Sequence, residues 1–406
     1  MNILVVSQYF YPENFRINDV AAALAEQGHR VKVLTGLPDY ASSKVPREYR
    51  FFRRRRESWN GVEIVRVPTL SRRRGMLCRA LNYASFAVSG ILYARMCRFR
   101  ADLVLSYQTS PVLQALPALS HKKRTGAPLL LYCCDLWPES LKAWGIGENH
   151  LLFRLMKGWS RWIYRGADRL AVTSAPFVEY LERELGLPRE RMTYLPQHAE
   201  DWFSSVCCRF EDHDTVNCLF AGNIGAVQNV DCLLEAASQL PEDSRLRLQI
   251  VGDGSELPRL RRLSEEWGLQ NRVTFYGARP AQDMPDFYRQ ADILVLTLRG
   301  GDFIGQTLPA KFQGYLGAGK PVAAAADGAV PLEMTAADCG ICVPAGDAQG
   351  LAAALEKMAA CPELYREKGR KGRRYFEEHF TLRQFMERLD ELIRQLTEAD
   401  EGTGKR

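Results

Sequence analysis

Short runs of apolar residues alternate with amphipathic stretches along almost the whole chain of 406 residues. Within each run the apolarity is continuous, which indicates strands covered on both faces, as in parallel sheets flanked by helices. This pattern and the length predict an α/β protein with two doubly wound domains in tandem. The expected strands are residues 3–7, 31–35, 62–67, 103–107, 129–133 and 170–173, then 216–221, 246–251, 273–276, 293–297, 321–325 and 341–344.

The domain boundary is expected beside Pro196, where a strand-like run ends and a polar stretch follows. We therefore predict a first domain over residues 1–196 and a second over 197–376. From Arg374 to Leu396, apolar residues recur at helical spacing, which predicts one amphipathic helix. We expect residues 377–406 to return to the first domain as this helix and to end in a polar, frayed tail.

Basic residues are concentrated in the first domain. Residues 46–100 hold 14 arginines, no lysine and three glutamates, a local excess of +11, whereas the whole chain carries only +6. The rest of the chain is therefore mildly acidic, and one face of the first domain is expected to be basic. Glycine and proline contents are ordinary, which excludes collagen-like and largely disordered classes.

The eleven cysteines lie mostly in apolar runs, where reduced thiols pack as small hydrophobes, and this favours the cytoplasm. Cys339 and Cys342 have C-x-x-C spacing but no second ligand pair, so we expect core packing there rather than zinc. The chain opens directly on an apolar strand, unlike a signal peptide. The longest uncharged run, residues 80–94, is shorter than the roughly 20 residues of a spanning helix.

Two loops of the second domain suit a phosphate. Gly222, Asn223 and Gly225 follow a strand and precede a helix, so backbone amides and the helix dipole could face an anion; a plain tight turn is the alternative. The pattern is not G-x-G-x-x-G, which disfavours NAD. Lys311 follows a glycine-rich entry to another helix and could place its ammonium on phosphate oxygens, unless it is a solvated surface lysine.

Two loops of the first domain combine aromatic and charged residues. The segment 8–19 follows the first strand and contains Arg16, and the segment 135–140 contains Asp135, Trp137 and Glu139. Aromatic faces stack on sugar rings and carboxylates accept from sugar hydroxyls, so these loops suit a saccharide. Helix capping by Asp135 is the alternative.

At these residues the sequence resembles the family 4 retaining glycosyltransferases of the GT-B fold, in particular a bacterial polysaccharide-assembly branch of fucosamine-type transferases. The matching stretches occur in the family's order from Ser7 to Val322: QYFYPENFRIND, VLTGLPDY, DLWPES, YLPQHAED, FAGNIG, VGDGSELPRL, FYGARP and LPAKFQGYLGAGKPV. The resemblance implies two facing Rossmann-like domains. It also implies transfer of a hexosyl or N-acetylaminosugar group from a nucleotide diphosphosugar, usually UDP-linked, with the anomeric configuration kept.

The resemblance also implies roles for single residues. The donor would bind the second domain and the acceptor the first, with Asp135 and Glu139 facing the reacting sugar and acceptor. The donor would be lined by Gly222, Asn223 and Gly225 at the diphosphate, Gly252, Asp253 and Gly254 at the floor, Tyr276, Gly277 and Arg279 at the base, and Thr307, Leu308 and Lys311 at the phosphates and sugar.

Several positions depart from the family's pattern. Two glutamates eight residues apart are common before the A-x-G-x-P-V segment, and here those positions are Gln306 and Gly314. The usual Arg and Lys of the diphosphate loop correspond to Asn223 and Gln228, and a frequent histidine corresponds to Cys134. The residues that usually contact the donor hydroxyls and ribose are therefore absent, and the family's common pattern does not assign these contacts.

The expected mechanism is electrostatic. Amides near Gly225 and Thr307, together with Lys311 and either Arg16 or Arg279, would stabilise the leaving diphosphate. A diphosphate oxygen would take the acceptor proton, so that Asp135 positions the acceptor. No cofactor is expected, because the nucleotide-sugar is a co-substrate. No metal is expected either, because the only D-x-D, residues 212–214, lies in a polar stretch and not at the end of a strand.

The arginines of residues 46–100 flank the uncharged run 80–94, which fits peripheral binding to the anionic inner face of the cell membrane. A polyprenyl diphosphate-linked acceptor in the assembly of a polysaccharide such as lipopolysaccharide would explain this basic face. A solvated face over a core helix is the alternative, and no nucleic-acid-binding module accompanies the charges. Two competing functions stay open: a GT-B-fold nucleotide-sugar epimerase and a non-catalytic donor-binding scaffold.

Overall fold

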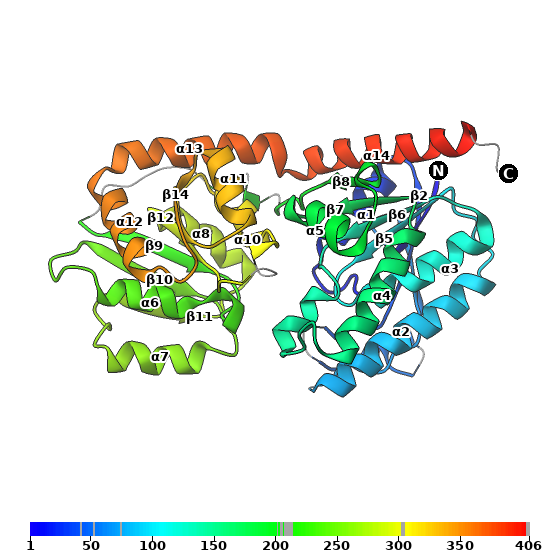
Figure 1. Ribbon diagram of the computed structural model, residues 1–406, viewed down its shortest axis with the longest axis horizontal. Helices are drawn as coiled ribbons and strands as arrows, with labels where there is room; N and C mark the ends of the chain where they lie inside the picture. Colours follow the sequence, from blue (N-terminus) through cyan, green and yellow to red (C-terminus); the bar gives the residue numbers. More distant parts are fainter. Residues whose placement is uncertain are drawn as a thin grey trace. The chain divides into compact units, whose positions relative to one another are not determined.

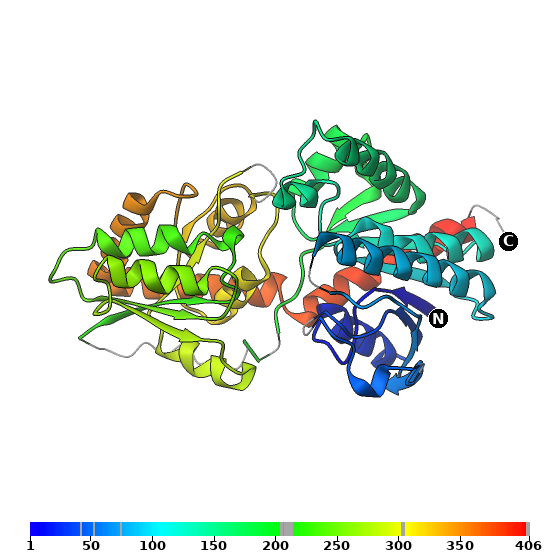
Figure 2. The same ribbon diagram turned by 90° about the horizontal axis from the view of Figure 1, so that it is seen from below.

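The computed structural model describes residues 1–40, 43–51, 53–73, 75–200, 202–203, 206, 214–301 and 305–402. The chain divides into two compact units (Figures 1 and 2). Unit 1 consists of Met1–Pro196 with Phe385–Arg406, and unit 2 of Gln197–Gln384. Each unit is an α/β domain built on a single sheet.

The sheet of unit 1 has the strand order β3-β4-β2-β1-β5-β6-β7-β8, and only the edge pair β3–β4 is antiparallel. The sequence pattern missed β3, because its residues Arg56–Trp59 are mostly polar; it joins β4 through a tight turn in which Asn60 and Gly61 both have positive φ. The strands are β1 Asn2–Val6, β2 Arg30–Thr35, β3 Arg56–Trp59, β4 Val62–Arg66, β5 Leu103–Gln108, β6 Leu129–Cys133, β7 Arg169–Val172 and β8 Met192–Tyr194.

Helices cover both faces of this sheet. On one face, residues of α1 and α14 meet Leu105, Leu130 and Tyr132; on the other, residues of α2, α4 and α5 meet Leu129 and Leu131. The helices are α1 Arg16–Glu26, α2 Met76–Met96, α3 Leu116–Thr125, α4 Leu151–Gly166, α5 Pro176–Leu185 and α14 Leu382–Gly402, with short 3-10 turns η1 Arg47–Tyr49, η2 Val112–Ala115, η3 Glu139–Trp144 and η4 Arg189–Arg191.

The sheet of unit 2 is wholly parallel, in the order β11-β10-β9-β12-β13-β14. From β9 the chain adds β10 and β11 on one side, and from β12 it adds β13 and β14 on the other, so the strand order switches between β9 and β12. In such sheets ligands bind near this switch point, beyond the carboxyl ends of the strands. The strands are β9 Val216–Ala221, β10 Leu246–Val251, β11 Val273–Gly277, β12 Ile293–Thr297, β13 Val322–Ala325 and β14 Gly340–Val343.

Neighbouring residues on each central strand of unit 2 belong to different cores. Leu219 packs into one cluster and Phe220 into another, on opposite faces of the sheet, which is why the apolar runs are continuous. The helices are α6 Val230–Ser238, α7 Leu257–Glu266, α8 Met284–Gln290, α10 Ala310–Gly317, α11 Ala329–Ala337, α12 Ala348–Ala360 and α13 Pro362–His379, with 3-10 turns η6 Ala226–Gln228 and η7 Ala281–Asp283.

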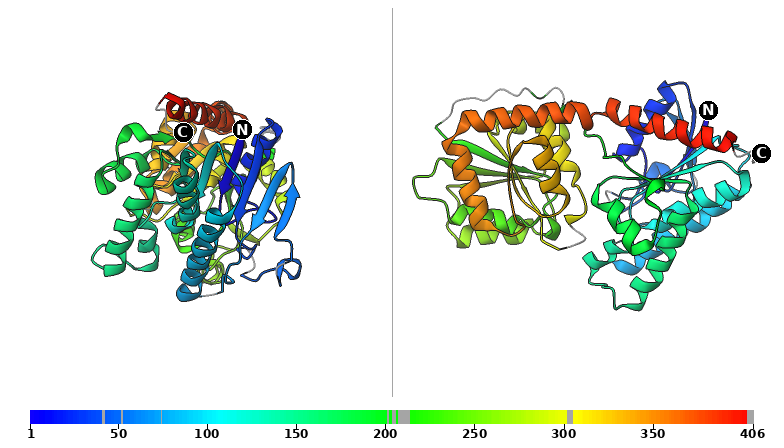
Figure 3. Two further views of the ribbon diagram at one scale, coloured as in Figure 1. Left: turned by 90° about the vertical axis from the view of Figure 1, so that its right-hand side faces the viewer. Right: turned by 45° about the horizontal axis from the view of Figure 1, so that its top comes forward.

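The helix expected from Arg374 to Leu396 is two helices. α13 ends at His379, and α14 begins at Leu382 with the Thr381 hydroxyl accepting from the Gln384 amide. Between them, Phe380 is buried in the core of unit 2 and its carbonyl accepts from the Ala199 amide. Within unit 1, the Phe385 ring of α14 lies 5.7 Å from the Tyr132 ring of β6. Figure 3 (right) shows α14, in red, lying along unit 1.

Candidate functional site

Three adjacent parallel strands of unit 2 each lead into a glycine with positive φ. Gly222 follows β9, Gly252 follows β10 and Gly277 ends β11. A Cβ on Gly252 would lie 1.8 Å from the Gly222 carbonyl oxygen, and one on Gly254 would lie 2.2 Å from the Ile224 carbonyl oxygen. The predicted glycines are therefore brought together, and the backbone approaches so closely that only glycine fits at 252 and 254.

Lys311 reaches this glycine cluster from the start of α10. A Cβ on Gly222 would lie 3.1 Å from Lys311 Nζ, and Nζ lies 3.9 Å from the centre of the Phe220 ring. The Nζ atom is buried and has no hydrogen-bond partner among the described residues. Burial lowers the pKa of the Lys311 ammonium to about 7.

The surroundings of Lys311 are unfavourable for a cation in three ways. The ammonium is desolvated, it has no acceptor among the described residues, and it sits on the second residue of α10, at the positive end of the helix dipole. The Phe220 ring face offsets only part of this cost. Such a combination is typical of a functional site, where an anion supplies the missing partner.

The loop after β9 is closed in the structure by Gln228. Its side-chain oxygen accepts from the Gly225 amide at 3.3 Å and from Asn223 Nδ2 at 3.2 Å. Ile224 N donates to the Asp253 carbonyl. The amide of Gly225, expected to face a diphosphate, is thus already bonded, although at the long end of hydrogen-bond distances.

The other predicted donor-site residues have mixed surroundings. Asp253 is exposed and its carboxylate accepts from the Gly254 amide at 2.8 Å, which shapes the loop. Arg279 is exposed beside the half-buried Tyr276, with its guanidinium carbon 5.9 Å from that ring. Leu308 is buried in the core, whereas Thr307 is half-buried. The Leu308 side chain therefore serves packing, and a ligand contact would have to come from its backbone.

Phe203 occupies the space next to Gly314. A Cβ on Gly314 would lie 2.4 Å from Phe203 Cζ, so a glutamate cannot stand there unless the ring moves. Gln306 is half-buried. Sequence reasoning missed both Phe203 and Phe220, because an aromatic residue in an apolar segment reads as ordinary core.

In unit 1, Asp135 lies in the loop after β6 and is bonded to the loop after β5. Its Oδ2 accepts from the Ser110 hydroxyl at 2.8 Å, and Ser110 in turn accepts from Trp137 Nε1 at 3.1 Å. Burial raises the pKa of the Asp135 carboxyl. A hydrogen bond from the Ser110 backbone also holds this carboxylate and opposes part of that rise.

Glu139 is buried, and both of its carboxylate oxygens have partners: Tyr180 donates at 2.7 Å and Lys142 Nζ lies at 2.8 Å. These contacts fasten η3 to α5 and engage both oxygens. Arg16 is the first residue of α1 and is half-buried. The structure brings Arg16 to the carboxyl end of β1, which is separated from β6 by β5 in the sheet.

A buried polar cluster that the sequence did not reveal joins the loops after β1 and β2 to α2. Asn82 of α2 accepts from Gln8 Nε2 at 2.8 Å and donates to Asp39 Oδ2 at 3.3 Å, and the Arg72 amide donates to the same Asp39 oxygen at 2.6 Å. Burial raises the pKa of the Asp39 carboxyl to about 6. The available signal was a polar residue in the loop after each strand, in the matching stretches QYFYPEN and VLTGLPDY.

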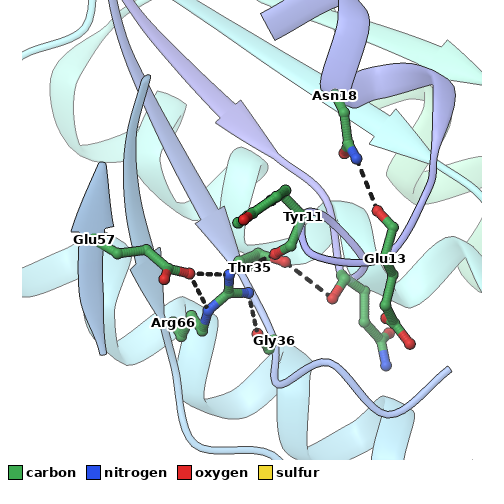
Figure 4. Close-up of polar contacts among 8 residues, drawn as sticks. Tyr11, Glu13, Asn18, Thr35, Gly36, Glu57 and Arg66 are labelled. Carbon is green, nitrogen blue, oxygen red and sulfur yellow. Dashed lines mark hydrogen bonds and ion pairs between the residues drawn. The ribbon is translucent and has the colours of Figure 1, made fainter. Parts of the chain in front are cut away.

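Arg66 fastens the same loops from the other side (Figure 4). It pairs with Glu57 on β3 and donates to the carbonyls of Tyr11 and Gly36. Thr35 Oγ1 donates to the Gln8 carbonyl, and Asn18 Nδ2 donates to the Glu13 carbonyl at 2.7 Å. Arg66 is therefore buried structure rather than part of the predicted basic face.

The described ranges contain no cluster of three or more His, Cys, Asp and Glu side chains suited to a metal ion. Two residues of the D-x-D, Asp212 and His213, lie outside those ranges. The nine cysteines that the structure describes are free thiols. No helix in the described part of the chain is long and apolar enough to cross a membrane.

Two family models match the chain: "Glycosyl transferase 4-like domain" over residues 14–198 and "Glycosyl transferases group 1" over 210–375. Among curated proteins, the putative colanic acid biosynthesis glycosyl transferase WcaI of Escherichia coli (strain K12) is 25% identical over 417 residues, with 95% of this chain and 99% of that protein covered. The probable glycosyltransferase WbjE of Pseudomonas aeruginosa is 25% identical over 235 residues, which are 55% of this chain and 57% of that protein.

Alignments with solved structures of the same fold cover both units of this chain. Sucrose-phosphate synthase from Thermosynechococcus elongatus has a TM-score of 0.75 at 18% identity and covers 98% of this chain and 99% of its own. Anabaena HepE in complex with UDP has a TM-score of 0.71 at 14% identity, and the alignment covers 98% of this chain and 100% of HepE. These likenesses confirm the predicted fold, and together with the two family matches they identify the chain as a glycosyltransferase of the GT-B fold.

Proposed function

We propose that this glycosyltransferase moves a sugar from a nucleotide diphosphosugar, UDP-linked, to a lipid-linked saccharide in the assembly of a cell-surface polysaccharide, with retention of configuration. The similarity to WcaI supports the polysaccharide assignment, and the HepE structures with UDP and with UDP-glucose support the donor class. The fucosamine-type branch is the narrower form of this proposal.

The observation that carries the donor assignment is the buried ammonium of Lys311 beside Gly222. A diphosphate placed against Gly222 would give Nζ the acceptor it lacks and would raise the lysine pKa, so that the cation is present when the leaving group develops charge. The diphosphate loop carries Asn223 and Gln228 instead of basic residues, so Lys311 supplies the charge from another element.

Donor binding also engages the loop after β9. Gln228 holds the Gly225 amide by a long hydrogen bond, and a phosphate oxygen is a stronger acceptor for that amide than a neutral side-chain oxygen. Gln228 is then released to donate its NH₂ to the same phosphate. Gly252, Asp253, Gly254, Tyr276, Gly277, Arg279, Thr307 and the Leu308 backbone complete the proposed donor site.

The acceptor side of the proposal rests on Asp135. Its position is set by Ser110 and Trp137, so the carboxylate can orient an acceptor hydroxyl while an oxygen of the leaving diphosphate takes the proton. Glu139 acts as a positioning residue for this loop through Tyr180 and Lys142. Arg16 is the residue of unit 1 proposed to approach the diphosphate. No metal ion and no cofactor take part in this scheme.

The proposed acceptor is a polyprenyl diphosphate-linked saccharide, and the proposed location is the cytoplasmic face of the membrane, reached through the basic residues of 46–100. Each basic residue near an anionic membrane surface contributes roughly 1 kcal/mol to binding. This places the enzyme where a lipid-linked acceptor is displayed.

The test is nucleotide release from a panel of UDP-, GDP- and dTDP-sugars, with and without a lipid-linked acceptor and with and without EDTA. Acceptor-dependent release of UDP that persists in EDTA is the expected result. Interconversion of the sugar without an acceptor would favour the epimerase, and abolition by EDTA with rescue by a divalent ion would overturn the metal-free scheme.

A further inference from the structure

Helix α2 exposes a continuous apolar stripe. Its outward positions recur at helical spacing, and they are occupied by large hydrophobic side chains where a soluble helix normally carries charges. Leu77 is 74% exposed and Met96 is 75% exposed. The full set on this helix is Met76, Leu77, Leu81, Val88, Leu92 and Met96.

Helix α4 and the preceding η3 expose a second group of large apolar side chains. Leu151, Leu155, Trp159 and Trp162 follow one another at spacings of three or four residues and so lie on one side of α4, and Trp162 is 63% exposed. Phe153, Ile163 and Tyr164 of the same helix are buried. The tryptophans thus lie on the solvent side, outside the core.

The two groups belong to one region of unit 1. The guanidinium of Arg79 on α2 lies 5.1 Å from the centre of the Trp144 ring on η3, and α2 and α4 both pack against η2. In Figure 1 both helices lie on the lower side of unit 1, and in Figure 2, seen from below, both face the viewer. Two neighbouring groups of exposed large apolar side chains mark a site that another surface covers.

The charges around this surface indicate what covers it. Residues 76–100 carry four arginines and 151–166 carry three arginines and a lysine, and neither segment contains Asp or Glu. A second copy of the chain docked face to face would bring these cations against one another. Anionic lipid headgroups above an acyl layer offer the complementary charge and the apolar medium, and tryptophan prefers that boundary.

We propose that the exposed sides of α2 and α4 form one interfacial membrane-docking surface, with Trp159 and Trp162 in the boundary between headgroups and acyl chains. This inference deepens the membrane part of the proposed function and rests on it. It also assigns the main contact to apolar side chains, whereas among the predicted arginines Arg66 is buried with Glu57 and the Arg72 guanidinium lies 4.3 Å from the centre of the Tyr40 ring. The proposed contact is chiefly apolar, with cations at its edge.

The test is co-sedimentation of the full chain with vesicles of phosphatidylcholine and phosphatidylglycerol at 3:1, and with phosphatidylcholine alone. The variant is Leu155→Ala with Trp159→Ala, whose side chains are 55% and 53% exposed. The matched control is Leu332→Ala with Trp267→Ala in unit 2, at 62% and 43% exposed. Both pairs lie on the surface, so thermal unfolding should be unchanged.

We expect the α4 pair to weaken binding to the anionic vesicles roughly tenfold or more, and the control pair to leave it unchanged. Equal binding of the α4 variant and the unaltered chain would overturn the docking surface. A second result would also overturn it: the unaltered chain does not bind vesicles, and sedimentation velocity shows that it forms a dimer which the α4 variant disrupts. Nucleotide release with a water-soluble acceptor is measured in parallel: its absence would count against the proposed function, whereas lost vesicle binding with intact release concerns the docking surface alone.

Discussion

The loops at the carboxyl ends of the two sheets differ in the charge and pairing of their buried polar groups. In unit 1, Asn82 bonds to both Gln8 and Asp39, although Gln8 Oε1 and Asp39 Oδ1 have no partner among the described residues. Arg66 ties the neighbouring loops together. In unit 2, Lys311 Nζ is buried without an acceptor within the described residues. The first arrangement joins the loops to α2, whereas the second leaves a buried cation whose cost is removed by an anionic ligand or by loss of its proton.

The largest expected effect comes from Lys311→Met, which keeps much of the volume and removes the charge. We expect turnover at saturating donor to fall about 100-fold, because one preorganised contact to the developing charge is lost. Without ligand the same variant should be more stable than the unaltered chain by about 1–3 kcal/mol at pH 7, because an unpaired buried ammonium is gone. Lys357→Met on the exposed side of α12 is the control.

The stability gain of Lys311→Met should depend on pH. The folded pKa of Lys311 is lowered from 10.5 to about 7, so the unfolded chain binds more protons between these values. The stability of the unaltered chain relative to the variant therefore rises from pH 7 towards pH 10, and below pH 7 the difference is constant. Urea unfolding at pH 6, 8 and 9.5 measures this difference in unfolding free energy. If the advantage of the variant does not shrink as the pH rises, the assigned burial of Lys311 is contradicted.

The next effect is Gly252→Ala. The new Cβ would lie 1.8 Å from the Gly222 carbonyl oxygen, so the loops after β9 and β10 must separate. We expect a loss of about 2–4 kcal/mol in unfolding free energy and weaker UDP binding. Gly268→Ala has positive φ but no atom within 4 Å of its Cβ, so it should cost only about 1 kcal/mol. Equal losses in both variants would show that φ, not close approach, dominates.

A smaller effect is expected in unit 1 from Asn82→Ala. The substitution leaves Gln8 and Asp39 each short of a partner in a buried place, which should cost about 1–3 kcal/mol. Ser89→Ala on the same helix removes only a bond to its own helix and should cost less than about 1 kcal/mol. Chemical unfolding compares them, and donor binding should survive in both, because the cluster lies in the other unit.

The sequence predicted most of the fold because the signal is local. Continuous apolar runs marked most strands of both sheets, but they missed β3, which is mostly polar, and β8, Met192–Tyr194, which has only three residues. The break between α13 and α14 was missed because Phe380 keeps the helical spacing of apolar residues while it packs into the core of unit 2. Its contacts with distant residues, not its type, end the helix.

The site was predicted only in part, for the same reason. Glycines after strands predict a close backbone approach, and the structure does bring together Gly222, Gly252 and Gly277. The burial of Lys311 depends on Phe220, 91 positions earlier in the chain, and the filling of the Gly314 position depends on Phe203. Such contacts between distant positions follow from packing and leave no mark in the local pattern.

The most direct test of the central claim is calorimetry of UDP binding at pH 8 in two buffers of different ionisation enthalpy. If the diphosphate is the partner of Lys311, a lysine of pKa about 7 must take up about 0.9 of a proton on binding, and Lys311→Met must take up none. Tight UDP binding by both proteins with no proton uptake in either would show that Lys311 does not hold the leaving group.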